Sequence, residues 1–168
     1  ALSYYNSFNL PLKIIRPFNA FGPRQSNRAI IPTVITQLLS ERKSIKVGNI
    51  HPRRDWTYVT DLCSAYYSLY KSKKGYGKIF NVGVGKHYSI SDMIKISQNL
   101  CNTKKKIIIE SKRQRPSKSE VNILQCDARS FKKEIGWSQK VNFKRGLSLT
   151  IQWFKENLNS KKSSIYQI

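Results

Sequence analysis

Apolar residues in this chain include two short runs that are bounded by turn residues. One run covers residues 12–15 and the other covers Ile79–Val82. Runs of this length between turns are typical of strands that are buried on both faces, as strands of parallel sheets are. We therefore predict a buried strand at each of the two positions.

Elsewhere the apolar positions repeat at the spacing of helices or short strands. The last predicted helix places Leu147, Ile151 and Phe154 on one face, as an amphipathic helix packed on a core requires. The alternation of strands with helices predicts an α/β fold. Helices are predicted over residues 30–39, 61–70, 89–100, 127–135 and 143–158, and short strands over 45–47, 56–59, 106–109 and 121–124.

Polar residues at the predicted helix ends indicate where those helices begin. Asp61 and Asp127 are expected to cap their helices through the carboxylate, and Ser89 competes with Ser91 to cap a third helix. Gly136 is expected to end the helix that follows Asp127 in the left-handed conformation. We therefore expect a structural role for Asp61 rather than a catalytic one.

The segment 16–25, R-P-F-N-A-F-G-P-R-Q, directly follows the first predicted strand. The carboxyl ends of strands in open α/β sheets are where ligands bind. Pro17 and Pro23 each restrict φ to about −65°, which makes the segment stiff, and Asn19 offers an amide that both donates and accepts hydrogen bonds. We interpret the segment as a binding loop, with an ordinary proline-rich connection as the alternative.

Three further motifs follow in a defined order. Together with segment 16–25, they resemble the carboxyl-terminal half of the extended short-chain dehydrogenase/reductase family, the NAD-dependent nucleotide-sugar epimerases and dehydratases. The resemblance extends over residues 1–157 and is closest to the hexose 4,6-dehydratases, including those that act on UDP-N-acetylglucosamine or GDP-mannose. The motifs are R-R-D-W-T-Y-V-T-D at 53–61, I-F-N-V-G-V-G at 79–85, and R-P at 115–116 with C-D at 126–127 and I-G-W at 135–137.

This resemblance implies the carboxyl-terminal part of a Rossmann-type parallel sheet together with a small α/β substrate-binding lobe. Residues 1–158 would form this unit and residues 159–168 a tail. The strands at 12–15 and 79–82 would belong to the parallel sheet, and the remainder mainly to the lobe. The complete enzyme would hold NAD tightly and form a homodimer. Whether it is a dehydratase or an epimerase stays open.

The resemblance also implies a binding site for a nucleotide diphosphate sugar. Arg54 and Arg115 would clamp the pyrophosphate, since a guanidinium can bond phosphate oxygens bidentately. Arg53 is the alternative register for Arg54. The chain has only 9 acidic residues, which argues against a plain ion pair for these arginines. The remaining matches are Asn19, Arg28, Ala29, Ile30, Val47 and Asn81 on the substrate side, and Pro17 and Phe18 at the edge of the nicotinamide pocket.

Two motifs of that family have no match in this chain. Gly83 and Gly85 follow a predicted strand, but Tyr88 stands where a third glycine of a G-x-x-G-x-x-G-like turn would be needed. Tyr67 and Lys71 have the spacing of the catalytic Tyr-x-x-x-Lys pair, yet a chain so rich in both residues yields such a match by chance, and these two fall on a predicted packing helix. We predict no catalytic residue and no activity of this chain alone.

The formal charge of +22 favours a rival function, because a field of that size attracts polyanions in a salt-dependent way. However, the basic residues are spread along the chain, and no segment interleaves aromatic with basic residues as base stacking requires. Nucleic acid is therefore the less favoured partner. A basic nucleic-acid-binding protein and a non-functional gene fragment stay as alternatives.

Three cysteines, Cys63, Cys101 and Cys126, lie far apart and form no metal-ligand pattern with the 2 histidines. We expect reduced, mostly buried thiols and no metal site. No apolar run approaches the roughly 18 residues of a membrane span, and the chain does not start with a signal pattern. We expect no membrane partner and a cytoplasmic location.

Overall fold

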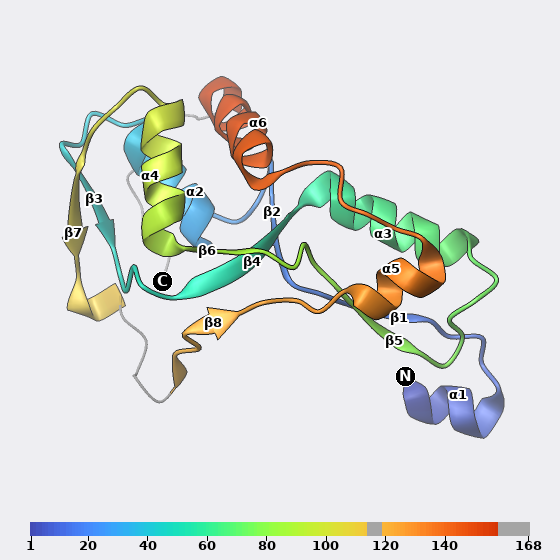
Figure 1. Ribbon diagram of the computed structural model, residues 1–168. Coiled ribbons are helices and arrows are strands. Elements are labelled where there is room, and N and C mark those ends of the chain that lie inside the picture. The colour runs from blue at the N-terminus through green and yellow to red at the C-terminus, as the bar shows by residue number, and fades with distance from the viewer. Residues whose placement is uncertain (114–118, 158–168) are drawn as a thin grey trace.

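The computed structural model describes residues 1–113 and 119–157, and it has a mixed α/β fold (Figure 1). The α/β prediction is confirmed. The helices are α1 (Leu2–Phe8), α2 (Ile30–Leu38), α3 (Val59–Lys71), α4 (Ile90–Leu100), α5 (Arg129–Ile135), α6 (Phe143–Asn157) and the 3-10 turn η1 (Ser111–Arg113). The strands are β1 (Ile14–Pro17), β2 (Asn19–Phe21), β3 (Ser44–Val47), β4 (Arg53–Tyr58), β5 (Ile79–Val82), β6 (His87–Ser89), β7 (Lys106–Ile109) and β8 (Ile123–Leu124).

Strands β1 and β5 form the first part of the fold, which we call the sheet lobe together with α3 and α5. The two strands were predicted from their apolar runs, and they run parallel with Ile14 opposite Ile79, as the family resemblance implied. Strand β1 begins two residues later than predicted and continues to Pro17, because Arg16 and Pro17 still have partners on β5. The core of this lobe contains Ala65, Leu69, Phe80, Val82, Phe131 and Trp137.

The second part, which we call the small lobe, contains the other strands with α2, α4 and α6. Strand β4 is its centre, since it pairs with β2 and β8 in parallel and with β6 antiparallel, while β3 and β7 form a separate parallel pair. Phe143 of α6 packs in its core: its ring stacks on Trp56 at 5.0 Å and on Tyr88 at 4.5 Å. Helices α2, α4 and α6 gather on one side of this lobe in Figure 1.

Two strands were not predicted. β2 lies inside the segment interpreted as a loop, and β6 precedes α4. Each has only three residues, too few for a period-two pattern to be visible, and each is formed by pairing with β4. Asn19 is the first residue of β2 and lies opposite Trp56. The candidate binding loop is therefore partly a strand.

The expected helix caps had different outcomes. Ser89 caps α4 in a reciprocal capping box with Asp92, so Ser89 and not Ser91 is the cap. Gly136 ends α5 at φ 75°, as predicted. Asp61 and Asp127 are not the caps: α3 is preceded by Tyr58 and α5 by Ala128.

Asp61 bonds outside its helix, whereas the Asp127 carboxylate accepts from the backbone N–H of Arg129, the first residue of α5, at 3.0 Å. Asp61 lies in the first turn of α3, and its carboxylate accepts hydrogen bonds from the backbone N–H groups of Lys140 at 3.1 Å and Val141 at 2.9 Å. This supports the structural role expected for Asp61. The Asp127 carboxylate also pairs with the Arg129 guanidinium.

The cysteines differ from the expectation of mostly buried thiols. All three are free, but Cys126 is buried, Cys101 is half-buried and Cys63 is exposed. Cys63 faces away from the core on α3, so its burial was predicted wrongly. Within residues 1–113 and 119–157, no helix is long and apolar enough to cross a membrane, and no cluster of three metal-ligating side chains occurs. The predicted tail, residues 159–168, lies outside the described residues.

Candidate functional site

A cavity of about 530 Å³ lies in the small lobe, where the amino end of α2, the end of β3 and strand β4 converge. One side is formed by residues on either side of the undescribed stretch 114–118, namely Arg113, Glu120, Val121 and Leu124. Six of the eight predicted substrate residues line the cavity, and they come from four separate stretches of the chain. They are Asn19, Arg28, Ala29, Ile30, Val47 and Arg54.

Asn19 is held at the cavity by the pairing of β2 with β4. Its Nδ2 donates to the backbone oxygen of Asp55 at 3.2 Å, which fixes one side of the amide. Gln25, five residues from Ala20, turns back and donates from Nε2 to the Ala20 oxygen at 2.9 Å. The Gln25 Oε1 is buried and accepts no hydrogen bond from any described residue. Sequence reasoning did not select Gln25, although it ends the G-P-R-Q motif.

Arg54 lies largely buried in the cavity wall, with 15% of its side chain exposed. Its Nη2 pairs with Glu120 Oε1 at 2.8 Å, and Nη1 donates to the backbone oxygens of Val121 at 2.6 Å and Arg53 at 3.0 Å. The ion pair that the shortage of acidic residues argued against is therefore present. Glu120 was missed because its partner lies 66 positions away.

Arg53, the alternative register, points to another surface. Its Nε donates to His87 Nδ1 at 2.8 Å, and its Nη2 lies 3.6 Å from Asp92 Oδ2. Neighbouring residues of a strand face opposite sides, so Arg53 and Arg54 cannot both face the cavity. Arg54 lines the cavity. This geometry favours Arg54 as the residue for an anionic ligand.

The cavity closes at Gly48 because the chain leaves no room there for a side chain. A Cβ at this position would lie 2.3 Å from the backbone oxygen of Arg113. Arg113 is held in turn by Glu110, to whose Oε2 its Nε donates. Bonds from Arg113 and Lys46 keep the pKa of the Glu110 carboxyl below its usual value. Sequence reasoning did not select Gly48, because its contact with Arg113 is not visible in the sequence.

The other predicted site residues lie elsewhere or outside the described chain. Pro17 ends β1, and the backbone N–H of Phe18 donates to the Val82 oxygen at 2.9 Å, which places both residues at the carboxyl end of the parallel pair. Asn81 is exposed on β5, opposite Arg16. None of these three residues lines the cavity. Arg115 lies outside the described residues.

Asp55 is a buried carboxylate that sequence reasoning also missed. It is fully buried in the middle of β4, and its carboxylate accepts from the backbone N–H groups of Val84 at 3.0 Å, Gly85 at 2.7 Å and Cys126 at 3.1 Å. A carboxylate satisfied by three amides can be buried without a cationic partner. Asp55 thereby holds the turn after β5 and the segment before α5 against the small lobe. The one signal in the sequence that could have identified Asp55 was its position in the motif R-D-W-T-Y-V.

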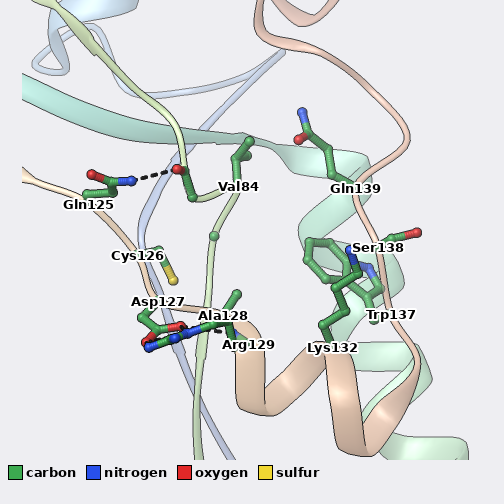
Figure 2. A pocket seen from close by; sticks show the side chains of 12 residues that line it. Val84, Gln125, Cys126, Asp127, Ala128, Arg129, Lys132, Trp137, Ser138 and Gln139 are labelled. Atoms are coloured by element: carbon green, nitrogen blue, oxygen red, sulfur yellow. Dashed lines mark hydrogen bonds and ion pairs between the residues drawn. The ribbon is translucent and has the colours of Figure 1, made fainter.

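A second cavity, of about 650 Å³, lies beside these Asp55 contacts (Figure 2). Gln125 Nε2 donates to the Gly85 oxygen at 2.7 Å on one side, and Lys132 and Trp137 lie on the other. Burial, with the nearby charges of Asp55 and Asp127, raises the pKa of Cys126 to about 12, so its thiol is not a nucleophile near neutral pH. Among the described residues, none of the predicted site residues lines this cavity.

The parallel pair of the sheet lobe, with the small mixed lobe beside it, belongs to the Rossmann-type fold of the epimerases and dehydratases. The family model described as GDP-mannose 4,6 dehydratase matches residues 1–150. The chain belongs to this family, and its resemblance to the nucleotide-sugar epimerases and dehydratases is confirmed.

Individual relatives agree with this assignment. The chain is 29% identical to human dTDP-D-glucose 4,6-dehydratase over 96% of its own length and 46% of that protein. It is 30% identical to UDP-glucuronate 4-epimerase of Thermodesulfobacterium geofontis over 96% of its own length and 48% of that protein. The crystal structure of dTDP-glucose 4,6-dehydratase from Bacillus anthracis in complex with NAD superposes with a TM-score of 0.83 at 29% identity, covering 94% of this chain and 49% of that one. The chain thus spans about half the length of these relatives.

Proposed function

We propose that this chain is the half of an NAD-dependent sugar-nucleotide 4,6-dehydratase or epimerase that binds the nucleotide diphosphate sugar. One observation carries the proposal: residues matched to separate positions of the family, among them Asn19, Arg28, Val47 and Arg54, line a single cavity. A coincidental set of matches would not be expected to meet around one space.

The chemistry of the cavity suits a diphosphate. Arg28 and Arg54 supply positive charge, and Arg54 offers the planar donors that bind phosphate oxygens. The amino end of α2 also faces the cavity at Ala29 and Ile30, and no side chain caps it and no acidic residue stands in its first turn. Uncapped backbone N–H groups and the helix dipole favour an anion at such an end. Val47, Ile30 and Trp56 supply apolar surface for a base or a sugar face.

We propose that this chain does not form an NAD site by itself. The 168 residues contain no glycine-rich phosphate turn of the expected form, and Pro17 with Phe18 offers only an edge at the carboxyl end of β1. We propose that the remainder of the NAD site and the proton-transfer groups belong to another segment of polypeptide. This chain would then bind and orient the sugar nucleotide, which can lower a reaction barrier by several kcal/mol when the rest is present.

Open surfaces of α1 and of the sheet lobe support the need for such a segment. No residue of α1 is buried, and Tyr4 and Phe8 on this helix are 58% and 70% exposed. Among the described strands, β5 alone pairs with β1. Parallel strands are normally paired on both sides and covered on both faces. A homodimer and a cytoplasmic location for the complete enzyme are part of the same proposal.

Calorimetric titration of the purified chain would test the proposal. The ligands are UDP-N-acetylglucosamine, GDP-mannose, dTDP-glucose and a short DNA duplex, each at about 50 and 200 mM salt. We expect saturable binding of one sugar nucleotide, reduced at least about tenfold in Arg54→Gln. Arg129→Gln, which removes the same charge from an exposed pair, should leave the affinity unchanged. Duplex binding that collapses with salt, without sugar-nucleotide binding, would instead establish the nucleic-acid alternative.

A further inference from the structure

Glu120 neutralises Arg54 in the cavity wall. The two side chains pair at 2.8 Å and are only 15% and 14% exposed, so the contact is largely shielded from water. A largely buried pair of this kind is screened by salt much less than a surface pair. A ligand anion therefore does not meet an isolated arginine at this position.

The donors of Arg54 are mostly occupied as well. A guanidinium has five N–H groups, and Nη1 gives two of them to the oxygens of Val121 and Arg53, while Nη2 gives one to Glu120. In the described contacts, the second Nη2 hydrogen and the Nε hydrogen are left for a ligand. The former sits on the same nitrogen that holds Glu120, so a phosphate oxygen bound there would lie beside a carboxylate oxygen.

The rest of the cavity contains no comparable negative charge. Among the described residues that line it, Glu120 is the sole acidic side chain, while Arg28, Arg54 and Arg113 are basic. Two like charges brought close together in a partly buried site repel strongly. Glu120 and a diphosphate thus compete for the same guanidinium.

We propose that the Glu120 carboxylate competes with a diphosphate ligand for the Arg54 guanidinium, and that the diphosphate displaces Glu120 when it binds. This inference rests on the proposed function, because it assumes that the cavity binds a diphosphate. Displacement requires the ligand to supply more favourable contacts than the carboxylate does. A nucleotide with two phosphates can do so, whereas a neutral nucleoside has no charge with which to compete for Arg54. The pair therefore lowers the affinity for a diphosphate and leaves nucleoside binding unchanged.

The test compares affinities for UDP, GDP and the neutral nucleosides uridine and guanosine by calorimetry. Glu120→Gln keeps the shape of the side chain and removes its charge, and we expect it to bind the preferred diphosphate about tenfold more tightly than the wild type. Glu134→Gln is the matched control, since it raises the net charge equally by breaking the surface pair with Lys78. It should leave the affinity unchanged, and neither variant should alter nucleoside binding. If Glu120→Gln does not fold, the diphosphate affinity of Glu120→Ala provides the same comparison.

The possible outcomes separate this inference from the function on which it rests. A gain confined to the Glu120 variants, and absent from the double variant Arg54→Gln/Glu120→Gln, supports the competitor role. Equal gains in Glu120→Gln and Glu134→Gln would reveal an effect of net charge alone and overturn it. Weaker diphosphate binding in Glu120→Gln would also overturn it, while leaving the site intact. Failure of every variant and of the wild type to bind any diphosphate would remove the proposed function, and the inference with it.

Discussion

The carboxylate of Asp55 accepts a hydrogen bond from the backbone N–H of Cys126 at 3.1 Å, which joins residues 71 positions apart. The same carboxylate accepts from Val84 and Gly85, so β4, the turn after β5 and the segment before α5 meet on one buried side chain. Asp55 follows Arg54 directly. The residue that holds the two lobes together is thus the neighbour of the arginine proposed to bind the ligand.

Asp55→Asn should destabilise the protein by about 3 kcal/mol, because the amide loses the charge and one of the two acceptor oxygens that serve three buried N–H groups. Urea unfolding followed by circular dichroism measures this change. Asp127→Asn is the control, since Asp127 pairs with Arg129 on the surface, and its unfolding midpoint should match the wild type. Equal midpoints for Asp55→Asn and the wild type would contradict the linking role.

Thiol reactivity should differ sharply among the three cysteines. Burial, with the charges of Asp55 and Asp127, raises the pKa of Cys126 to about 12, and burial also raises the pKa of Cys101. A thiol whose pKa is raised stays protonated, and so unreactive, at mildly alkaline pH. At pH 8 a disulfide reagent should modify Cys63 rapidly, and Cys126 only after urea unfolding. Peptide mass mapping would identify the modified residue; early labelling of Cys126 would show that the Asp55 contacts open readily.

The capping box of α4 predicts a stability change in acid. Hydrogen bonds from Ser89, first from its side chain and then from its backbone, lower the pKa of Asp92 below 3.8. A carboxyl whose folded pKa is depressed stabilises the protein above its unfolded value, and this contribution is lost as the pH falls through the folded one. The loss should therefore appear below about pH 4.

Ser89→Ala tests this cap directly. It should cost about 1 kcal/mol at pH 7 and flatten the pH dependence below pH 4. Ser91→Ala serves as the control, because Ser91 lies inside the helix and does not cap it. Urea midpoints at pH 7 and in the acid range measure both effects. A cost for Ser91→Ala equal to that for Ser89→Ala would contradict the assignment of the cap.

Gly48→Ala should open the cavity wall. The new Cβ would meet the Arg113 oxygen at 2.3 Å, and that oxygen belongs to the backbone, so one of the two segments must move. We expect a cost of about 1 to 3 kcal/mol in unfolding and weaker sugar-nucleotide binding. Unfolding and calorimetry on the same sample would measure the two effects. Unchanged values for both would mean that the wall is not packed as described.

Local pattern was sufficient for much of the fold. The apolar run at Ile79–Val82 predicted β5, and the spacing of Leu147, Ile151 and Phe154 predicted α6, because each element shows its own periodicity within a few residues. Ser89 and Gly136 were recognised for the same reason, since a cap acts on its immediate neighbours. Comparison with a known family selected eight substrate residues, and six of these eight line the cavity.

The sequence alone determined the fold class, the family and most of the elements whose signals are local. The tertiary structure decided what depends on residues far apart in the chain. Strand β2 exists because Asn19 lies opposite Trp56, the guanidinium of Arg54 is neutralised by Glu120 at a separation of 66 positions, and Gly48 is required by the Arg113 oxygen. The physical reason is that pairing, charge compensation and close packing depend on distance in space, which the order of residues along the chain does not contain.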